Sequence, residues 1–434
     1  MAQDSIRQMA LNARKAGLLL NALSNDRRNQ ALLAMGESIE RNLPQIIAAN
    51  KRDLQNAERA NLNAPMLSRL RFDENKAARV IAGLAALATL PDPLGHVQYA
   101  NELADGLRLY RVSCPIGVIG VIFESRPDAL VQISSLCLKS GNAVLLKGGR
   151  EAIETNQALF QAIAEGTAKA GLPDGWCHLL QSREDVASML QQDDAIDLII
   201  PRGSNSFVHH IMKTSSIPVL GHSEGICHVY VDQAADIAQA VNITVDSKAQ
   251  NLSVCNAAET LLVHREIAPI FLPAVAQALR EKDIVLRGCP ETRKFINCEA
   301  ATEDDWHTEY LDAILSVKVV ADIDEGISHI NTYGSRHTDA ILSQDAASID
   351  RFMTFVDSAD VFANCSTRFA DGFMYGFGAE VGIATGKIHA RGPMGLEGLC
   401  TYKYKLYGQG HTMEALNAGA FMLTHRSIPD VDGV

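Results

Sequence analysis

One cysteine of the chain stands in a sequence context that suits chemistry better than packing. Cys255 lies in KAQNLSVCNAAET (248–260), among small and polar residues and just before an apolar run. By contrast, Cys137 lies in an apolar helical pattern and Cys227 in a strand-like alternation, and both are explained as small buried hydrophobic residues. The Asn, Gln and Ser side chains around Cys255 can hydrogen-bond to a ligand that comes and goes. Cys255 is therefore a candidate nucleophile, although the local sequence alone leaves a structural role open.

Basic residues follow three of the strands expected in the first half of the chain: Arg126, Lys147 with Arg150, and Arg202. In an open parallel sheet such turns share one edge, where ligands bind, and each opens a helix whose free N–H groups favour anions. Any one of these side chains alone could be a solvated turn charge. Together they predict a crevice that binds an anionic ligand with phosphates. The dinucleotide fingerprint G-x-G-x-x-G is absent, so a nucleotide must be held in another way, or not at all.

The elements that must position these residues alternate between short apolar runs and longer amphipathic segments. The first ninety residues have apolar positions at spacings of three and four, which is typical of helices, and the turn at 91–95 ends them. Strands are expected at 107–113, 116–123, 142–146, 177–180, 197–200, 259–264, 283–287, 313–320, 339–343 and 360–364, and helices at about 128–140, 151–170 and 184–191. This alternation predicts an α/β fold with parallel sheets, in two lobes that divide near residue 231.

The tail contains one more alternating segment, TYKYKLYG (401–408). We expect this strand to pair with 107–113 or with another subunit, unless it is an ordinary sheet edge.

The net charge and the residue composition of the 434-residue chain limit the classes of function that it can have. A net charge of −12 argues against a general nucleic-acid partner. Nine scattered cysteines without a CxxC pair argue against a disulfide framework and a structural zinc site, and they fit a reducing cytoplasm. The thirteen histidines show no convincing ligand spacing, so no metal is expected. The first ten residues do not resemble a signal peptide, and no apolar run is long enough to span a membrane.

The order of several short strings resembles the aldehyde dehydrogenase superfamily. PIGVIGVIF, NAVLLK, RGS, a glycine-rich GHSEG, an isolated cysteine and EYLDAILSVKVV follow one another along the chain. VIFESRPDAL, LLKGGREA, GHSEGICHVYVD and AEVGIATGKIHARGPMGLEGL resemble one branch of the superfamily, which reduces an acyl phosphate. The resemblance covers essentially the whole chain. It implies an aldehyde-dehydrogenase-like α/β fold with two open parallel-sheet lobes and a small β extension for oligomerisation.

The resemblance also implies a division of the chain into domains with different functions. Residues 1–230 are expected to form an NADP(H)-binding domain with N-terminal helices, with 97–112 contributing to an oligomerisation hairpin. Residues 231–395 are expected to form a catalytic domain that carries Cys255. Residues 396–434 would supply an oligomerisation strand and a C-terminal tail.

Functional positions of the superfamily can be carried over where the residues match. Cys255 falls at the catalytic nucleophile. Glu309 matches the glutamate that holds the nicotinamide ribose, unless it is an exposed surface carboxylate. The other expected cofactor contacts are Lys147, Gly148, Gly149 and Arg150 near the adenosine ribose, and Gly203 and Ser204 beside the pyrophosphate.

Three departures from the superfamily pattern are informative. His222 stands where other members of the superfamily have a glutamate that activates water. An enzyme that exchanges its acyl group with phosphate has no need of that base. If the alignment is shifted by two residues, Glu224 takes the position and would be a base. Arg126 stands where an oxyanion-binding asparagine is usual, and an arginine suits an acyl phosphate. Arg150 replaces a glutamate that faces the ribose 2′-hydroxyl, which favours a 2′-phosphate and hence NADPH.

The expected reaction is the NADPH-dependent reduction of L-glutamyl 5-phosphate to L-glutamate 5-semialdehyde through a Cys255 thioester, in proline biosynthesis. Ser125 and Arg126 are expected at the phosphate, and Asn256 or Asn251 at the oxyanion. Arg368 and Asp371 are candidates for the α-carboxylate and α-ammonium groups, with structural roles equally open. A homo-oligomer (a dimer or a dimer of dimers) and a glutamate 5-kinase that hands over the unstable substrate are the expected partners. The alternatives are a coenzyme-A-acylating aldehyde dehydrogenase and a non-catalytic nucleotide-binding relative.

Overall fold

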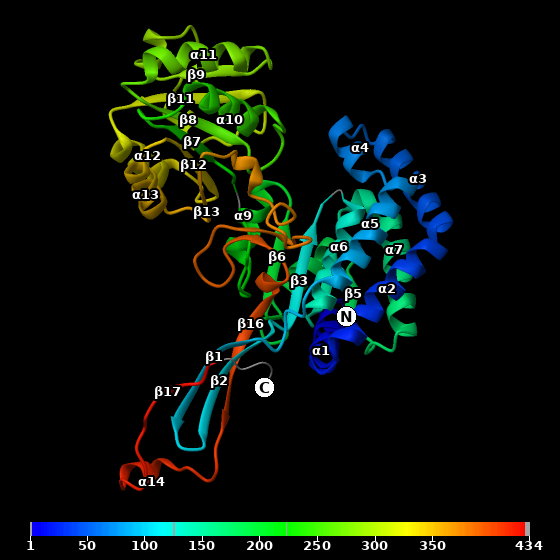
Figure 1. The fold of residues 1–434 in the computed structure, drawn as a ribbon. Helices are drawn as coiled ribbons and strands as arrows, with labels where there is room; N and C mark the ends of the chain where they lie inside the picture. The colour runs from blue at the N-terminus through cyan, green and yellow to red at the C-terminus, as the bar shows by residue number, and fades with distance from the viewer. Residues whose placement is uncertain (1, 125, 223, 430–434) are drawn as a thin grey trace.

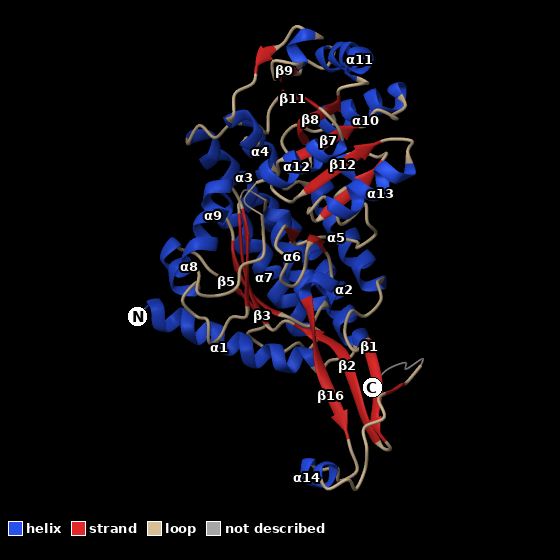
Figure 2. Ribbon diagram, turned by 90° about the vertical axis from the view of Figure 1, so that its left-hand side faces the viewer, coloured by secondary structure: helices blue, strands red, loops and turns tan. Residues whose placement is uncertain are grey.

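The structure is a computed structural model that describes residues 2–124, 126–222 and 224–429. Two α/β lobes lie one above the other, and a narrow β arm extends from the lower lobe (Figure 1). Helices cover both faces of the sheets, as Figure 2 shows from the side. The predicted fold class, two parallel-sheet lobes with a small β extension, is confirmed.

The first lobe is built around a parallel sheet with the strand order β5-β4-β3-β6 within the described residues. Its elements are β3 (Val118–Phe123), α6 (Pro127–Lys139), β4 (Ala143–Lys147), α7 (Ile153–Lys169), β5 (Cys177–Leu179), α8 (Arg183–Met189), β6 (Leu198–Arg202) and α9 (Asn205–Thr214). Every residue of β3 and β4 is buried, as expected for continuous apolar strands covered by helices on both faces.

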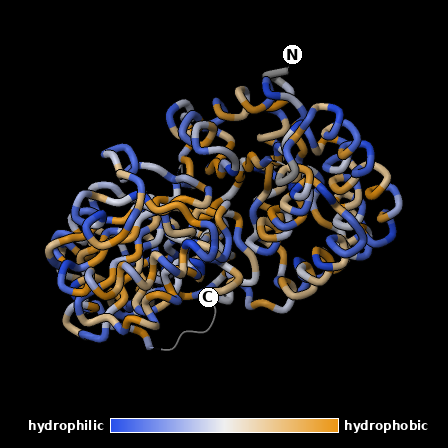
Figure 3. Tube along the Cα trace, turned by 90° about the horizontal axis from the view of Figure 1, so that it is seen from above, coloured by the Kyte–Doolittle hydropathy of each residue, from blue (hydrophilic) through white to orange (hydrophobic). Residues whose placement is uncertain are grey.

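Five N-terminal helices pack against this lobe. They are α1 (Ala2–Asn21), α2 (Asn25–Arg41), α3 (Leu43–Arg59), α4 (Ala64–Leu70) and α5 (Glu74–Thr89). The apolar side chains of α2, such as Leu32 and Met35, share one core with Leu130 of α6 and Val144 of β4. Hydrophilic residues are concentrated on the outer turns of these helices (Figure 3).

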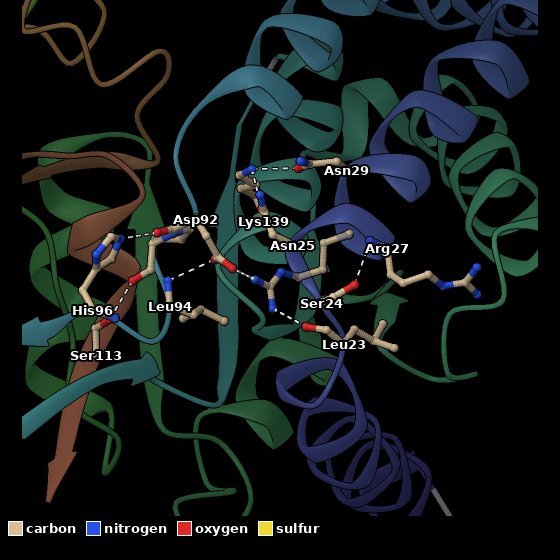
Figure 4. A network of polar contacts seen from close by, with 12 residues as sticks. Leu23, Ser24, Asn25, Arg27, Asn29, Asp92, Leu94, His96, Ser113 and Lys139 are labelled. Carbon is tan, nitrogen blue, oxygen red and sulfur yellow. Dashed lines mark hydrogen bonds and ion pairs between the residues drawn. The ribbon is translucent and has the colours of Figure 1, made fainter. Parts of the chain in front are cut away.

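A polar network ties α2 to α6 and to the turn that leads into the β arm (Figure 4). Arg28 is buried and donates to both carboxylate oxygens of Asp92 at 2.6 Å. The buried Lys139 donates to the side-chain oxygens of Asn25 and Asn29 at 2.8 and 2.7 Å. Buried charges are tolerated only when they are paired or hydrogen-bonded, so these contacts fix the helices in register.

The second lobe is built around a larger sheet with the order β10-β9-β11-β8-β7-β12-β13, and the pairings described there are parallel. Its elements are β7 (Cys227–Val231), α10 (Ile237–Ala249), β8 (Ala258–His264), α11 (Ala268–Arg280), β9 (Val285–Gly288), β10 (Glu299–Ala300), β11 (Ile314–Val320), α12 (Ile323–Tyr333), β12 (Thr338–Leu342), α13 (Ala346–Phe355) and β13 (Asp360–Ala363).

The two sheets divide the chain differently from the expected ranges in two places. β7 pairs with β8 and β12, so the second sheet begins at residue 227, before the expected boundary after residue 230. The antiparallel pair β14 (Gly382–Ala384) and β15 (Gly392–Met394) was expected in the catalytic range, but Ala384 and Met394 join the core of the first lobe. Hydrophobic alternation locates a strand but does not say which sheet it joins.

The β arm is an antiparallel sheet with the order β16-β2-β1-β17 within the described residues. Its elements are β1 (Val97–Ala104), β2 (Leu107–Pro115), β16 (Cys400–Tyr407), α14 (Met413–Asn417) and β17 (Arg426–Ser427). The strand predicted in the tail therefore pairs with the strand predicted at 107–113, which was one of the expected alternatives. In the described ranges no helix has the length and apolar character needed to cross a membrane.

Candidate active site

Cys255 lies in the loop between α10 and β8, and the chain that precedes β7 holds its backbone in place. A Cβ atom on Gly225 would lie 2.0 Å from the Cys255 carbonyl oxygen and 2.7 Å from its Cα, so only glycine fits there. The Cys227 thiol donates to the same carbonyl oxygen at 3.2 Å. The glycine-rich string before β7 therefore serves to let two backbone segments meet at the candidate nucleophile.

The charges around Cys255 oppose one another. Burial, together with the nearby Glu309 and Glu380 carboxylates, raises the pKa of the Cys255 thiol to about 12, although Arg202 acts in the opposite direction. The thiol is therefore protonated at neutral pH in this state of the protein. The site in this state does not favour the thiolate, because burial and two carboxylates outweigh one guanidinium.

Two histidines lie beside the thiol. The Cys255 sulfur and one ring nitrogen of each of His222 and His337 all lie within 4.8 Å of one another. The two imidazoles meet edge to face, with their centroids 4.9 Å apart. Burial lowers the pKa of His222 and places that of His337 well below its usual value, so both rings are neutral at pH 7. A neutral imidazole can accept a proton from a thiol.

Two arginines form the cationic side of the site. Arg126 precedes α6, whose first turn carries Pro127 and Asp128, and its guanidinium donates to the Asp128 carboxylate at 2.8 Å. After burial, the proximity of Arg126 is the next largest influence that lowers the pKa of Arg202, so the two guanidiniums are neighbours. Both counteract the burial that raises the pKa of Glu380. The expected gathering of Arg126 and Arg202 at one place is thus seen, whereas Ser125 lies outside the described residues.

The turn after β4 lines a surface pocket. Lys147, Gly148, Gly149 and Arg150 form one side of it, and Asn156 contributes from α7. A Cβ atom on Gly148 would lie 2.1 Å from the Asn156 amide nitrogen, so any larger residue would have to displace that side chain. The buried Lys147 ammonium donates to the Gly148 carbonyl oxygen, and burial lowers the pKa of Lys147. Two cations at this turn suit a phosphorylated ribose.

The N-terminus of α9 brings the two lobes together. The Ser204 N–H donates to the Glu124 carboxylate at 3.3 Å, and Gly203 lies against the same carboxylate, so an anionic group already sits at this helix end. The Asn205 side chain donates to Glu309 Oε2 at 2.6 Å. Burial raises the pKa of Glu309, which is therefore a partly buried group between the lobes rather than an ordinary surface carboxylate.

The other candidate substrate residues hold loops together. The Asn256 amide nitrogen donates to the Ala370 carbonyl oxygen at 2.9 Å, which ties the nucleophile loop to the segment after β13. Arg368 donates to the Gln250 side chain at 2.9 Å. Asp371 accepts from the backbone N–H groups of Phe373 and Met374. Asn251 accepts from the Ser253 N–H at 3.2 Å. The structure brings these residues near the loop, and their roles toward a substrate stay predictions.

Sequence reasoning missed two features of the site. His337 precedes β12 by one residue, in a string that carries no motif. Lys248 and Glu259 form a fully buried ion pair at 2.6 Å that brackets the nucleophile loop. Burial raises the pKa of Glu259 to about 7 against the opposing effect of Lys248. No local pattern marks either feature, because both arise from contacts between distant segments or across a loop.

Comparisons with known proteins agree with this geometry. The sequence model of the aldehyde dehydrogenase family matches residues 2–287. Gamma-glutamyl phosphate reductases of Pelotomaculum thermopropionicum and Acetivibrio thermocellus are 58% and 57% identical, over 93% and 94% of this chain and 93% and 95% of theirs. The crystal structure of gamma-glutamyl phosphate reductase from Thermotoga maritima has a TM-score of 0.92 at 37% identity, covering 94% of this chain and 99% of that one.

An acetylating aldehyde dehydrogenase from Geobacillus thermoglucosidasius has a TM-score of 0.64 at 15% identity, covering 95% of this chain and 98% of that one, which shows the fold alone. The chain therefore belongs to the aldehyde dehydrogenase family, and within it to the gamma-glutamyl phosphate reductases. The branch resemblance drawn from the sequence strings is confirmed.

Proposed function

We propose that this protein reduces L-glutamyl 5-phosphate to L-glutamate 5-semialdehyde with NADPH and releases phosphate, as a step of proline biosynthesis. The observation that carries the proposal is a partly buried thiol, Cys255, near the neighbouring guanidiniums of Arg126 and Arg202. Guanidiniums bind phosphate oxygens in a bidentate way, so the substrate's phosphate would lie beside the nucleophile. The name of the close relatives describes this substrate and this reaction type.

The first chemical step is attack by Cys255 on the acyl carbon. The thiol gives its proton to the neutral imidazole of His222, its sulfur bonds to the carbonyl carbon, and the bond to the phosphate oxygen breaks. Because the Cys255 pKa is about 12 and that of His222 is lowered, a standing ion pair is unfavourable, so the proton moves as the attack proceeds. Phosphate leaves with its charge stabilised by Arg126 and Arg202, and a thioester remains.

The cofactor site fits NADPH. Lys147 and Arg150 bring two positive charges to the pocket after β4, which Gly148 and Gly149 also line. When bound, NADPH supplies the hydride that reduces the thioester. Glu309, held by Asn205 at the junction of the lobes, would orient the nicotinamide ribose. Collapse of the thiohemiacetal then returns the proton to the sulfur and releases the aldehyde.

We place two features of the cellular context within the same proposal. The outer strand β16 exposes Tyr402, Tyr404 and Leu406, and this arm would pair with a second copy in a dimer or a dimer of dimers. All nine cysteines lie in the described part of the chain and are free thiols, which suits a reducing cytoplasm.

A glutamate 5-kinase would supply the unstable acyl phosphate. Absence of a complex with this kinase in co-sedimentation at high concentration would count against direct transfer of the substrate.

The test runs the reaction backwards with glutamate semialdehyde, NADP⁺ and phosphate, and follows the absorbance of the reduced cofactor. We expect turnover that requires phosphate, that is lost in Cys255→Ala, and that is kept in Cys365→Ala, a matched free and partly buried cysteine. Turnover without phosphate would mean hydrolysis and would make Glu224 the base. Turnover only with coenzyme A would support an acylating enzyme. No turnover at all would support a non-catalytic relative.

A further inference from the structure

We propose that Cys255, His222 and His337 form a binding site for a thiophilic divalent cation such as Zn²⁺, and that the bound ion reversibly blocks the nucleophile. The three side chains come from separate parts of the chain: the loop after α10, the segment before β7 and the residue before β12. Their ligand atoms lie within 4.8 Å of one another. Thiolate and imidazole are the ligands that zinc prefers.

The hydrogen bonds of His222 leave one ring nitrogen free for an ion. Its Nδ1 lies 3.0 Å from the Ile383 carbonyl oxygen, and because a carbonyl only accepts, Nδ1 carries the proton. In the neutral ring Nε2 then has an exposed lone pair. A metal-binding histidine commonly donates its other ring N–H to a backbone carbonyl in this way, which fixes its tautomer and orientation.

His337 supplies the second, independent sign of a ligand. It is fully buried, and its Nδ1 lies 2.8 Å from the Thr338 hydroxyl. Its Nε2 is buried and has no hydrogen-bond partner among the residues that the structure describes. A buried polar atom without a partner is costly, and a metal ion at the centre of the triad would remove that cost. In the tautomer in which Nδ1 donates its proton to the hydroxyl, Nε2 is the nitrogen available to an ion.

The geometry needs a modest contraction to close on an ion. Zinc bonds to sulfur at about 2.3 Å and to nitrogen at about 2.0–2.1 Å, so tetrahedral ligands lie roughly 3.3–3.7 Å apart. Pairs at the 4.8 Å limit must therefore approach one another by up to about 1.5 Å, which the partly exposed side chains of Cys255 and His222 can supply by rotation. A tetrahedral ion would take its fourth ligand from water or from a phosphate oxygen.

Occupation of the site exchanges a proton for the ion. The Cys255 S–H bond breaks, a sulfur–zinc bond forms and one proton is released, with no change of oxidation state. The sulfur's reacting electron pair is then held by the metal, so the thiol can no longer attack an acyl phosphate. A chelator reverses the block. This inference needs only the three side chains and does not depend on which substrate the enzyme reduces.

A spectroscopic titration tests the site directly. We expect Co²⁺ added to the full chain to produce a thiolate-to-cobalt charge-transfer band with a stoichiometry of one, which Zn²⁺ abolishes by displacement. The band should vanish in Cys255→Ala and persist in the control Cys365→Ala. Because Thr338 orients His337, Thr338→Val should weaken metal affinity by about 10–100-fold. His222→Asn and His337→Asn remove a ligand and should weaken it at least as much.

A second measurement on the unaltered protein covers the case in which a His337 variant does not fold. Stoichiometric Zn²⁺ should protect Cys255, but not Cys365, from alkylation by iodoacetamide, with the sites read by mass spectrometry, and a chelator should restore reactivity. Absence of a cobalt band in the wild-type protein would overturn the proposal. So would a band that survives in Cys255→Ala, or Zn²⁺ that leaves Cys255 as reactive as before.

Discussion

The reactivity of Cys255 should depend on the two kinds of charge around it in opposite senses. Glu380 raises the pKa of the thiol, and Arg202 lowers it. Glu380→Gln should therefore lower the thiol pKa, and Arg202→Gln should raise it further. A nearby charge typically shifts a pKa by about 1–3 units. Both side chains are partly exposed, so we take about one unit for each, which is about 1.4 kcal/mol.

This shift translates into a smaller change of alkylation rate. One unit gives about tenfold more or less thiolate, but thiolate nucleophilicity falls with pKa with a Brønsted slope of about 0.4–0.5, so the net change is about threefold to fourfold. Glu380→Gln should thus accelerate alkylation of Cys255 by that factor, and Arg202→Gln should slow it by the same factor. The two variants should differ by about tenfold.

The assay is pseudo-first-order alkylation by iodoacetamide, with the Cys255 peptide quantified by mass spectrometry between pH 6 and pH 9. Because the thiol pKa is about 12, the wild-type rate should rise by about tenfold per pH unit and reach no plateau in this range. The matched control is Glu281→Gln, an exposed carboxylate after α11. A plateau below pH 9 would refute the raised pKa. Variants that both slow the reaction would refute the opposing-charge argument.

Three further predictions concern other parts of the molecule. Gly225→Ala should lower kcat by about 100-fold or more, because the new Cβ atom displaces the Cys255 backbone; near-normal turnover by a folded variant would contradict this. Arg150→Ala should raise KM for NADPH at least about tenfold and leave KM for NADH nearly unchanged, and equal effects on both would argue against a 2′-phosphate contact. Asp92→Ala should leave the Arg28 guanidinium buried without its partner and cost about 3 kcal/mol of unfolding free energy in denaturant melts, whereas a change below about 1 kcal/mol would show that water replaces the carboxylate.

Much of the fold follows from local sequence, because strands and helices have their own periodicities. The strands β3 and β4 are continuous apolar runs that end in polar turns, and their positions agree with the expectation within a few residues. Local sequence does not predict which strands pair with one another. β7 follows the first lobe in the chain yet joins the second sheet, and β14 and β15 return to the first lobe. Nothing in the alternation records which core a strand enters.

Some residues of the candidate site can also be found from local sequence, and others cannot. Cys255, Lys147 and the arginines stand in strings with distinctive residue types, so they could be picked out from the sequence. His337 could not, because its proximity to Cys255 depends on the packing of β12 beside β7, which joins segments more than eighty residues apart. Asn256 illustrates the converse: the sequence predicts an oxyanion contact for this polar residue, the structure shows its amide holding the backbone at Ala370, and its role toward a substrate stays a prediction.

The protonated thiol and the neutral histidines are two aspects of one electrostatic arrangement. An anionic substrate bound beside Cys255 would raise the thiol pKa still further unless Arg126 and Arg202 neutralise the substrate's negative charge. With carboxylates already nearby, a standing thiolate would be disfavoured, so activation has to come from a neutral base that acts only during attack. The neutral imidazole of His222, with a free lone pair on Nε2, is such a base. The same lone pair and the same sulfur attract a divalent cation, because an ion of charge +2 stabilises the thiolate that the site otherwise disfavours. Sensitivity to zinc would then be a consequence of how the site activates its nucleophile, and variants that weaken one property should weaken the other.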